Sequence, residues 1–172
     1  MPEDFVSLRK RAAFARWLLL AAGIAALDQW SKGAILARFF YGERVVVTEF
    51  FNLVLVWNPG ASFSLLAGAG GWQRWFFIAL AVLVSLWILR VLWATPERRL
   101  QSAALSAILG GALGNVMDRF RHGAVVDFLD VHLADWHWPA FNVADCAVTL
   151  GAALFILCAW REDGAERNGN VS

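Results

Sequence analysis

Charged residues are scarce in this chain: they make up 17% of its 172 residues, and the formal net charge is only +1. A chain with so little excess positive charge lacks the basic surface that nucleic acid binding requires. Cysteine is rare as well, and Cys146 and Cys158 both fall in one apolar segment without the spacing of metal ligands. That pattern argues against a disulfide framework and against a zinc site.

Hydrophobic residues dominate instead, since they form 59% of the chain and give a mean hydropathy of +0.55. This apolar content exceeds what the core of a soluble domain needs, so the sequence predicts an integral membrane protein of mainly α class. A helix needs about 20 apolar residues to cross the hydrocarbon core of a bilayer. Four transmembrane helices are therefore expected, at about 17–36, 72–92, 100–119 and 141–160.

Two stretches between these helices have a different character. Residues 41–66 are rich in β-branched and aromatic residues and include the turn signal Asn58-Pro59-Gly60, so they predict a small β-rich segment. Open strands cannot lie bare in lipid, which puts this segment at the membrane surface. Residues 120–140 are expected to form a loop on the same side. The whole chain, 1–172, is then a single membrane domain.

Basic residues set the expected orientation. Nine of the fifteen Lys and Arg residues lie on the side that holds both chain ends. Cytoplasmic loops of membrane proteins carry the excess of basic residues. The sequence therefore predicts that both termini are cytoplasmic, and that the β-rich segment and the 120–140 loop are extracytoplasmic.

Polar groups gather at the outer ends of three of the four helices and at the end of the β-rich segment. Each ionisable group at membrane depth costs roughly 2.5 kcal/mol or more, so a chain that keeps several close together is expected to use them. Spacings of three and four residues put the members of each set on one helical face. The sets are Asp28, Ser31 and Lys32; Asn115, Asp118, Arg119 and His122; Asn142 and Asp145; and Asn58. The alternative is that these residues only cap or flank helix ends.

Two common hydrolase motifs are missing. The chain contains no HExxH zinc motif, and the segment from Gly60 to Ser64 lacks the second glycine of a GxSxG nucleophile elbow. His122, His132 and His137 fall in one loop, where a solvated surface role is expected rather than metal ligation. Carboxylates therefore remain as the groups that could carry chemistry.

Asp127 and Asp145 are two candidates among these carboxylates, and the sequence by itself leaves the choice open. Asp127 follows Val125-Val126 just beyond the third helix, and Asp145 lies one turn inside the fourth. Two carboxylates held close together share one proton, so the pair can activate a water and protonate a leaving group. On spacing alone, Asp130 and Asp135 compete with them.

Five segments in order resemble the motifs of the bacterial lipoprotein signal peptidase family, also called signal peptidase II. They are DQWSK at 28–32, NPGASFS at 58–64, GGALGNVMDR at 110–119, GAVVDFLD at 123–130 and FNVAD at 141–145. The resemblance covers nearly the whole chain, and Ser62, where a second alanine is common, is a slight departure. It implies an intramembrane aspartyl endopeptidase of the bacterial cytoplasmic (inner) membrane. Such an enzyme removes the signal peptide from diacylglyceryl-modified prolipoproteins and cleaves before the lipid-modified cysteine.

The resemblance also implies roles for individual residues. Asp127 and Asp145 would be catalytic, near the outer leaflet, with the β-rich segment as an extracytoplasmic cradle. The other matching positions would shape the site or bind substrate: Asp28, Lys32, Asn58, Asn115, Asp118, Arg119 and Asn142. The expected partners are lipid-modified prolipoproteins, membrane lipid and cyclic peptide inhibitors of the globomycin type. A monomer is expected, with no metal and no organic cofactor.

Two other classes of protein stay open on the residues alone. A small transporter would relay ions through intramembrane charges and predicts polar groups along the full bilayer depth. A structural scaffold would bind partner helices through the small residues Gly110 and Gly114. It predicts that Asp127 and Asp145 can both become Asn without loss of function.

Overall fold

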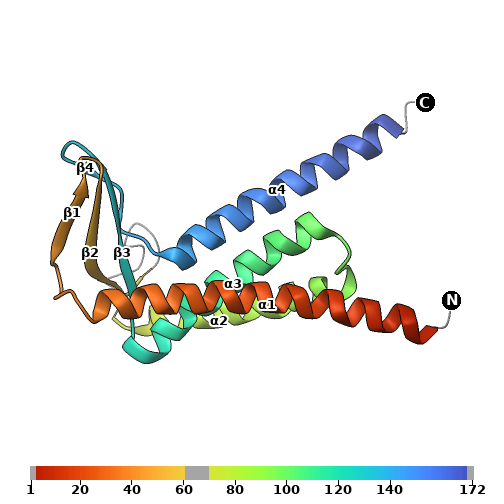
Figure 1. Cartoon of the computed structure of the whole chain (residues 1–172), viewed down its shortest axis with the longest axis horizontal. Helices are drawn as coiled ribbons and strands as arrows, with labels where there is room; N and C mark the ends of the chain where they lie inside the picture. Colours follow the sequence, from red (N-terminus) through yellow and green to blue (C-terminus); the bar gives the residue numbers. More distant parts are fainter. Residues whose placement is uncertain (1–2, 61–69, 170–172) are drawn as a thin grey trace.

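The computed structural model describes residues 3–60 and 70–169, with side chains described for 7–60 and 70–161. The described residues form four helices and one four-stranded sheet (Figure 1). The helices are α1 (Glu3–Leu36), α2 (Trp72–Ala94), α3 (Arg99–His122) and α4 (Val143–Gly169). The strands are β1 (Arg44–Thr48), β2 (Phe51–Asn58), β3 (Val125–Leu133) and β4 (Trp136–His137).

Each helix contains a stretch long and apolar enough to cross a membrane, which confirms the expected class of four membrane helices with a small sheet. Helix α1 begins well before the expected position 17, because residues 3–16 include several good helix formers, three Ala and three Arg among them. Its 34 residues correspond to about 51 Å, more than the ~30 Å hydrocarbon core of a bilayer. One end of α1 therefore extends past the lipid.

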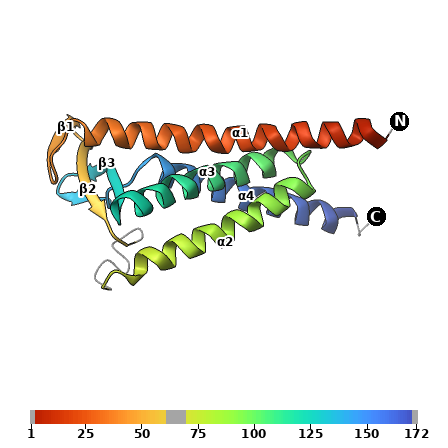
Figure 2. The same ribbon diagram turned by 90° about the horizontal axis from the view of Figure 1, so that it is seen from below.

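Helix α3 is the central helix of the bundle, with α1 and α2 on either side of it (Figure 2). Glycines allow this close approach. A Cβ atom at Gly110 would lie 2.6 Å from the Ala21 carbonyl oxygen of α1, and one at Gly151 of α4 would lie 2.7 Å from the Ala104 carbonyl oxygen of α3. Such contacts leave no room for a side chain, so these positions fix the helix spacing.

The sheet stands across one end of the bundle (Figure 1). Its strands pair antiparallel in the order β1-β2-β3-β4. The segment 120–140, expected as a loop, thus contains two strands. Its carboxylates and histidines hid the strand pattern, although the run Val125-Val126 is typical of a buried strand. Residues 61–66 of the expected β-rich segment, including Ser62 and Ser64, lie outside the described residues.

A small hydrophobic cluster fastens the sheet to the bundle. Its buried members come from the end of α1, from β2 and from β3: Ile35, Leu55, Val126 and Phe128. Gly123, with φ 80°, ends α3 and donates its N–H to the Arg119 carbonyl at 3.1 Å. A glycine suits this left-handed conformation because it has no Cβ. The turn leads directly into β3 and so carries Asp127 back over the bundle.

Candidate active site

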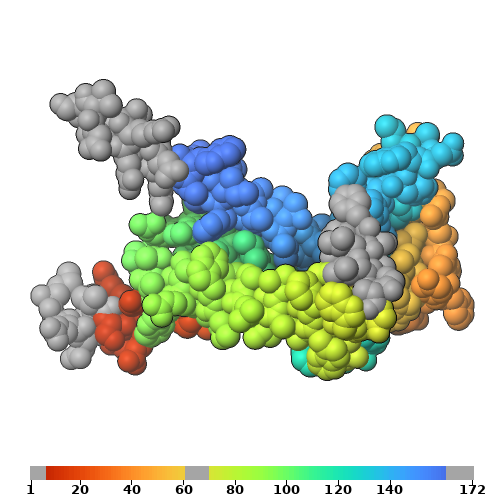
Figure 3. Space-filling view, turned by 180° about the vertical axis from the view of Figure 1, so that it is seen from behind, coloured from red at the N-terminus to blue at the C-terminus, as the bar shows by residue number. Residues whose placement is uncertain are grey.

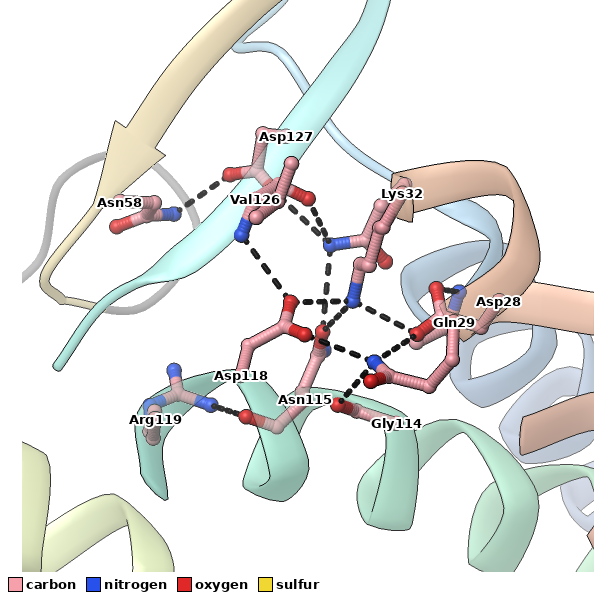
Figure 4. A network of polar contacts seen from close by, with 12 residues as sticks. Asp28, Gln29, Lys32, Asn58, Gly114, Asn115, Asp118, Arg119, Val126 and Asp127 are labelled. Carbon is pink, nitrogen blue, oxygen red and sulfur yellow. Dashed lines mark hydrogen bonds and ion pairs between the residues drawn. The ribbon is translucent and has the colours of Figure 1, made fainter. Parts of the chain in front are cut away.

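The polar residues singled out in the sequence meet at the sheet end of the bundle (Figure 4). Five elements supply them: the second half of α1, the end of β2, the second half of α3, β3 and the start of α4. The residues brought together are Asp28, Lys32, Asn58, Asn115, Asp118, Arg119, Asp127, Asn142 and Asp145.

Lys32 lies at the centre of this cluster and is only 2% exposed. Its Nζ lies 2.8 Å from a carboxylate oxygen of Asp28 and 2.8 Å from one of Asp118, and it donates to Asn115 Oδ1 at 3.0 Å. Both carboxylates are buried as well. Because a buried charge that loses its partner costs about 3–5 kcal/mol, these three side chains depend on one another.

The two carboxylates bound by Lys32 also hold backbone from other elements. Asp28 Oδ1 accepts the N–H of Ala144 at 2.8 Å, in the first turn of α4. Asp118 Oδ2 accepts the N–H of Val126 at 3.1 Å, in β3. The charged cluster therefore ties α1 and α3 to the two elements that carry Asp145 and Asp127.

Asn142 and Asp145 form a reciprocal cap at the start of α4. Asp145 N–H donates to Asn142 Oδ1 at 2.9 Å, and Asn142 N–H donates to Asp145 Oδ2 at 3.3 Å. This is the capping-box arrangement, in which two otherwise unpaired backbone donors are satisfied. Asn115 Nδ2 donates to the other oxygen of Asp145 at 2.9 Å. The cap fixes the orientation of the Asp145 carboxylate.

Asp127 in β3 is held by two amides. Asn142 Nδ2 donates to its Oδ1 at 2.7 Å, and Asn58 Nδ2 donates to its Oδ2 at 3.0 Å. The side chain is 2% exposed. Burial, followed by the negative charge of Asp145, raises the pKa of Asp127 to about 7, although the two amide bonds act in the opposite direction. Near neutral pH this carboxyl group can therefore hold or release a proton.

Asp127 and Asp145 line the same cavity, which has a volume of about 180 Å³. The other lining residues are Asn58, Gly60, Asn115, Arg119, Val125 and Ala140. The space can hold several water molecules, each of which takes about 30 Å³ in the liquid. The two carboxylates thus line one polar chamber that is large enough for water.

Arg119 forms one wall of this chamber and stays charged. One NH2 donor binds the Gly60 carbonyl at 2.9 Å, and the guanidinium lies 5.1 Å from the centre of the Phe77 ring. Among the described residues its buried Nε has no hydrogen-bond partner. An unsatisfied buried donor is costly, so this group is suited to bind a carbonyl oxygen that enters the chamber.

Sequence reasoning missed Gln29, which joins the cluster next to Asp28. Its Nε2 donates to Asp118 Oδ1 at 2.8 Å and to the Gly114 carbonyl at 3.2 Å, and its Oε1 accepts from Arg121 at 2.7 Å. The only signal in the sequence was its place beside Asp28. A glutamine in that position is equally typical of a residue at the membrane interface, so the sequence did not indicate a place in the site.

Asp130, a competitor of Asp127 on spacing, belongs to a different polar group. It accepts from Asn52 Nδ2 at 2.8 Å and contacts His137 Nδ1 at 2.8 Å, with Arg44 Nε at 3.6 Å. Burial alone would raise the pKa of Asp130, but these bonds and charges hold the pKa below its ordinary value. Asp130 therefore fastens β1, β2 and β4 to β3. The exposed Asp135 is not among the residues that line the chamber.

His132 and His137 are less exposed than the solvated role expected for them, whereas His122 is exposed as expected. His137 is half-buried against Asp130, and its ring stacks on that of His132 with a centroid distance of 4.8 Å. His122 lies against Trp57 at 5.2 Å. Among the described residues, no group of three or more His, Cys, Asp or Glu side chains is arranged to hold a metal ion.

Comparisons with known proteins bear on this arrangement. Residues 20–161 match the family model described as signal peptidase (SPase) II. The lipoprotein signal peptidase of Cupriavidus necator is 55% identical over 141 residues, which are 82% of this chain and 81% of the relative. That of Azoarcus sp. is 52% identical over 157 residues, covering 88% and 89% of the two chains.

Two solved structures are similar as well, and each is described as a bacterial membrane enzyme. One has a TM-score of 0.78 at 27% identity and covers 87% of this chain and 90% of its own. The other has a TM-score of 0.72 at 28% identity, with coverage of 84% and 92%. Both matches extend over most of the chain.

Proposed function

Because the chain belongs to the signal peptidase II family and is thus a protease, we propose that Asp127 and Asp145 are its catalytic pair. One observation carries this proposal: the two carboxylates line a single chamber and are each bound by neutral amides. Amide donors orient a carboxylate without neutralising it. The pair can therefore keep one shared proton near neutral pH, as an aspartyl protease requires.

In the proposed mechanism, Asp127 holds the proton and Asp145 is ionised. The pKa of about 7 for Asp127 supports this assignment, as does the place of Asp145 in the first turn of α4, where the helix dipole favours negative charge. Asp145 takes a proton from a water molecule as that water attacks the scissile carbonyl carbon. Asp127 donates its proton to the carbonyl oxygen. The tetrahedral intermediate then collapses: one of its two hydroxyl groups returns a proton to Asp127 as the carbonyl re-forms, the C–N bond breaks, and the leaving amine takes the proton held by Asp145.

The proposed substrates are diacylglyceryl-modified prolipoproteins, cleaved just before the lipid-modified cysteine. The relatives' name, lipoprotein signal peptidase, supports this substrate class. The one-sided position of the site also supports it: the buried ionisable residues of the described chain all lie at the sheet end, whereas an ion transporter would need them along the full depth. A substrate anchored by lipid stays in one leaflet, so a site at the level of the sheet meets the scissile bond there.

We assign the remaining polar residues to shaping the chamber and binding substrate. Lys32, Asp28 and Asp118 hold the elements together, and Asn58, Asn115 and Asn142 orient the two carboxylates. Arg119 is the candidate for contact with a substrate carbonyl. The proposal further includes a single 1–172 membrane domain, a monomer in contact with membrane lipid, cytoplasmic termini in the bacterial inner membrane, a site near the outer leaflet, and inhibition by cyclic peptides of the globomycin type.

The test is cleavage of a purified diacylglyceryl-modified prolipoprotein by the full-length protein in detergent. Asp127→Asn and Asp145→Asn are compared with Asp135→Asn, which removes an exposed carboxylate from the turn between β3 and β4. The same precursor without its lipid is the control for the substrate. Thermal unfolding of each variant shows whether it is folded.

We expect the parent and Asp135→Asn to cut only the lipid-modified precursor, before its cysteine, and both site variants to lose at least about 1,000-fold in turnover. If a folded Asp127→Asn or Asp145→Asn variant keeps substantial activity, the pair is wrong. Equal cleavage of both precursors would contradict the substrate class while leaving the pair untouched.

A further inference from the structure

A cavity lies at the other end of the bundle, far from the sheet. Its volume is about 840 Å³. It lies between the first turns of α1 and the connection from α2 to α3. Figure 3 shows these segments side by side, with the described start of α1 in red and the connection in green. The lining residues are Arg9, Lys10, Ala12, Ala13, Arg16, Ala94, Pro96, Glu97 and Arg99.

The wall formed by α1 has small residues flanked by cations. Arg9, Ala12, Ala13 and Arg16 follow the spacing i, i+3, i+4 and i+7, so they lie on one face of the helix. Because the side chains of the two alanines are small, they leave room for the cavity between the two arginines. Arg99 contributes a third guanidinium from the start of α3.

The charge of the lining is strongly positive. Four of the lining residues that the structure describes are basic and one, Glu97, is acidic. Guanidinium groups bind phosphate oxygens through paired N–H donors, and a concave basic surface concentrates anions. The cavity is therefore suited to a phosphate ester.

The ends of the apolar spans indicate that the cavity lies at the level of lipid headgroups. The apolar span of α2 ends at Ala94 and that of α3 begins at Arg99, both at the cavity wall. Trp17 Nε1 donates to the Pro96 carbonyl at 2.7 Å, and Lys10 Nζ lies 5.6 Å from the centre of the Trp93 ring. Tryptophan gathers at the interface between lipid tails and water.

We propose that this cavity binds the headgroup of an anionic phospholipid, with the phosphodiester between the guanidinium groups of Arg9, Arg16 and Arg99. Two smaller cavities share these arginines. One of about 310 Å³ is lined by Arg16, Trp17 and Arg99, and one of about 340 Å³ includes Arg99, Leu100 and Arg161 in its lining. Both carry apolar side chains beside the cations, where the glycerol and the first methylene groups of a lipid can lie. This binding site is independent of the proposed catalytic pair.

A topology signal is the competing account of these arginines, because basic residues at helix ends orient membrane proteins. That account needs charge but no particular position. Arg11 distinguishes the two accounts, since it lies in the same turn of α1 and is exposed, but is not among the residues that line the cavity. For topology Arg11 counts as much as Arg9.

The experiment measures binding of phosphatidylglycerol to the full-length protein in detergent by native mass spectrometry, with phosphatidylcholine as the zwitterionic comparison. The variants are the double substitution Arg9→Gln with Arg16→Gln, and Arg11→Gln as the control. We expect the double variant to lose about 30-fold in affinity for phosphatidylglycerol, on the order of fivefold per basic side chain near a phosphate. Arg11→Gln should change it less than about twofold.

Three results would overturn the proposal. The first is a loss of about fivefold for Arg11→Gln, which is as large per side chain as the loss in the double variant and would mean bulk charge. The second is equal affinity for phosphatidylcholine. The third is displacement of phosphatidylglycerol by inorganic phosphate at a concentration comparable to that of the lipid. Sodium chloride of equal ionic strength is the reference. Such displacement would mean that the site binds free phosphate. Peptidase turnover in lipid-free detergent is measured alongside, so a misfolded variant is recognised.

Discussion

The thermal unfolding midpoint of Asp127→Asn, relative to that of the parent, should be higher at high pH than at low pH. Asp127 is 2% exposed, and burial next to Asp145 raises its pKa to about 7 from an ordinary 3.8. The folded state therefore binds the proton more tightly than the unfolded state does. Stability from this group is greatest at low pH and is lost as the pH rises from about 4 to about 7.

The size of the effect follows from the same pKa. In the folded parent Asp127 is protonated at pH 5 and ionised at pH 8.5. The unfolding free energy of the parent therefore falls by about 3 kcal/mol between these two pH values, at 1.36 kcal/mol per unit of pKa. An asparagine has no proton to lose. Its amide also meets the donors of Asn58 and Asn142, but that clash does not depend on pH and cancels when the two pH values are compared.

The assay is thermal unfolding in detergent, followed by the fluorescence of the ten tryptophans. The midpoint of Asp127→Asn minus that of the parent should rise by about 5–10 °C from pH 5 to pH 8.5. Asp135→Asn, an exposed carboxylate in the turn between β3 and β4, controls for charge alone. The same difference at both pH values would refute the reasoning that buried Asp127 binds its proton unusually tightly.

Four further outcomes are expected. Turnover should fall about 20-fold between pH 6.5 and pH 8.5 as Asp127 loses its proton, measured with saturating substrate; a flat profile would rule out Asp127 as the acid. Asn142→Ala removes a cap and an amide bound to Asp127, so it should cost about 1–2 kcal/mol in unfolding free energy and about 100-fold in turnover. Asp130→Asn should destabilise by about 1–2 kcal/mol in the same unfolding assay but keep turnover within about threefold, because Asp130 does not line the chamber. Gly151→Leu should lower the unfolding midpoint, since its Cβ meets the Ala104 carbonyl, whereas Gly33→Leu, with nothing within 4 Å, should not.

Much of the fold follows from apolar run length alone. A span of about 20 residues is set by the thickness of the bilayer, so the four membrane helices were predictable and their existence is confirmed. The resemblance drawn from the five motifs is confirmed as well. What run length could not give is where each helix ends beyond the lipid. Helix α1 continues to Glu3 because good helix formers follow one another there, independent of the membrane.

Strand β3 shows why the sheet was harder to predict than the helices. Its partner β2 is more than sixty residues away in the sequence, and the bonds that make β3 a strand come from that partner. Within β3, Asp127 and Asp130 are buried although they are acidic, since amides from Asn52, Asn58 and Asn142 satisfy them. A pattern of apolar and polar residues assumes that carboxylates face water, and here that assumption fails.

The candidate residues are placed so that one site combines tight ion pairs with two carboxyl groups, Asp127 and Asp145, that can still gain or lose a proton. The ion pairs of Lys32 go to Asp28 and Asp118, which in turn hold the backbone of α4 and β3. Charge attraction thus assembles the elements. Asp127 and Asp145 are held by amides instead. If Lys32 paired directly with Asp127, the ammonium would keep that carboxylate ionised, and the pair could not share a proton near neutral pH. Separating the structural cation from the proposed catalytic acids is therefore what allows a buried, rigid cluster to carry acid and base chemistry.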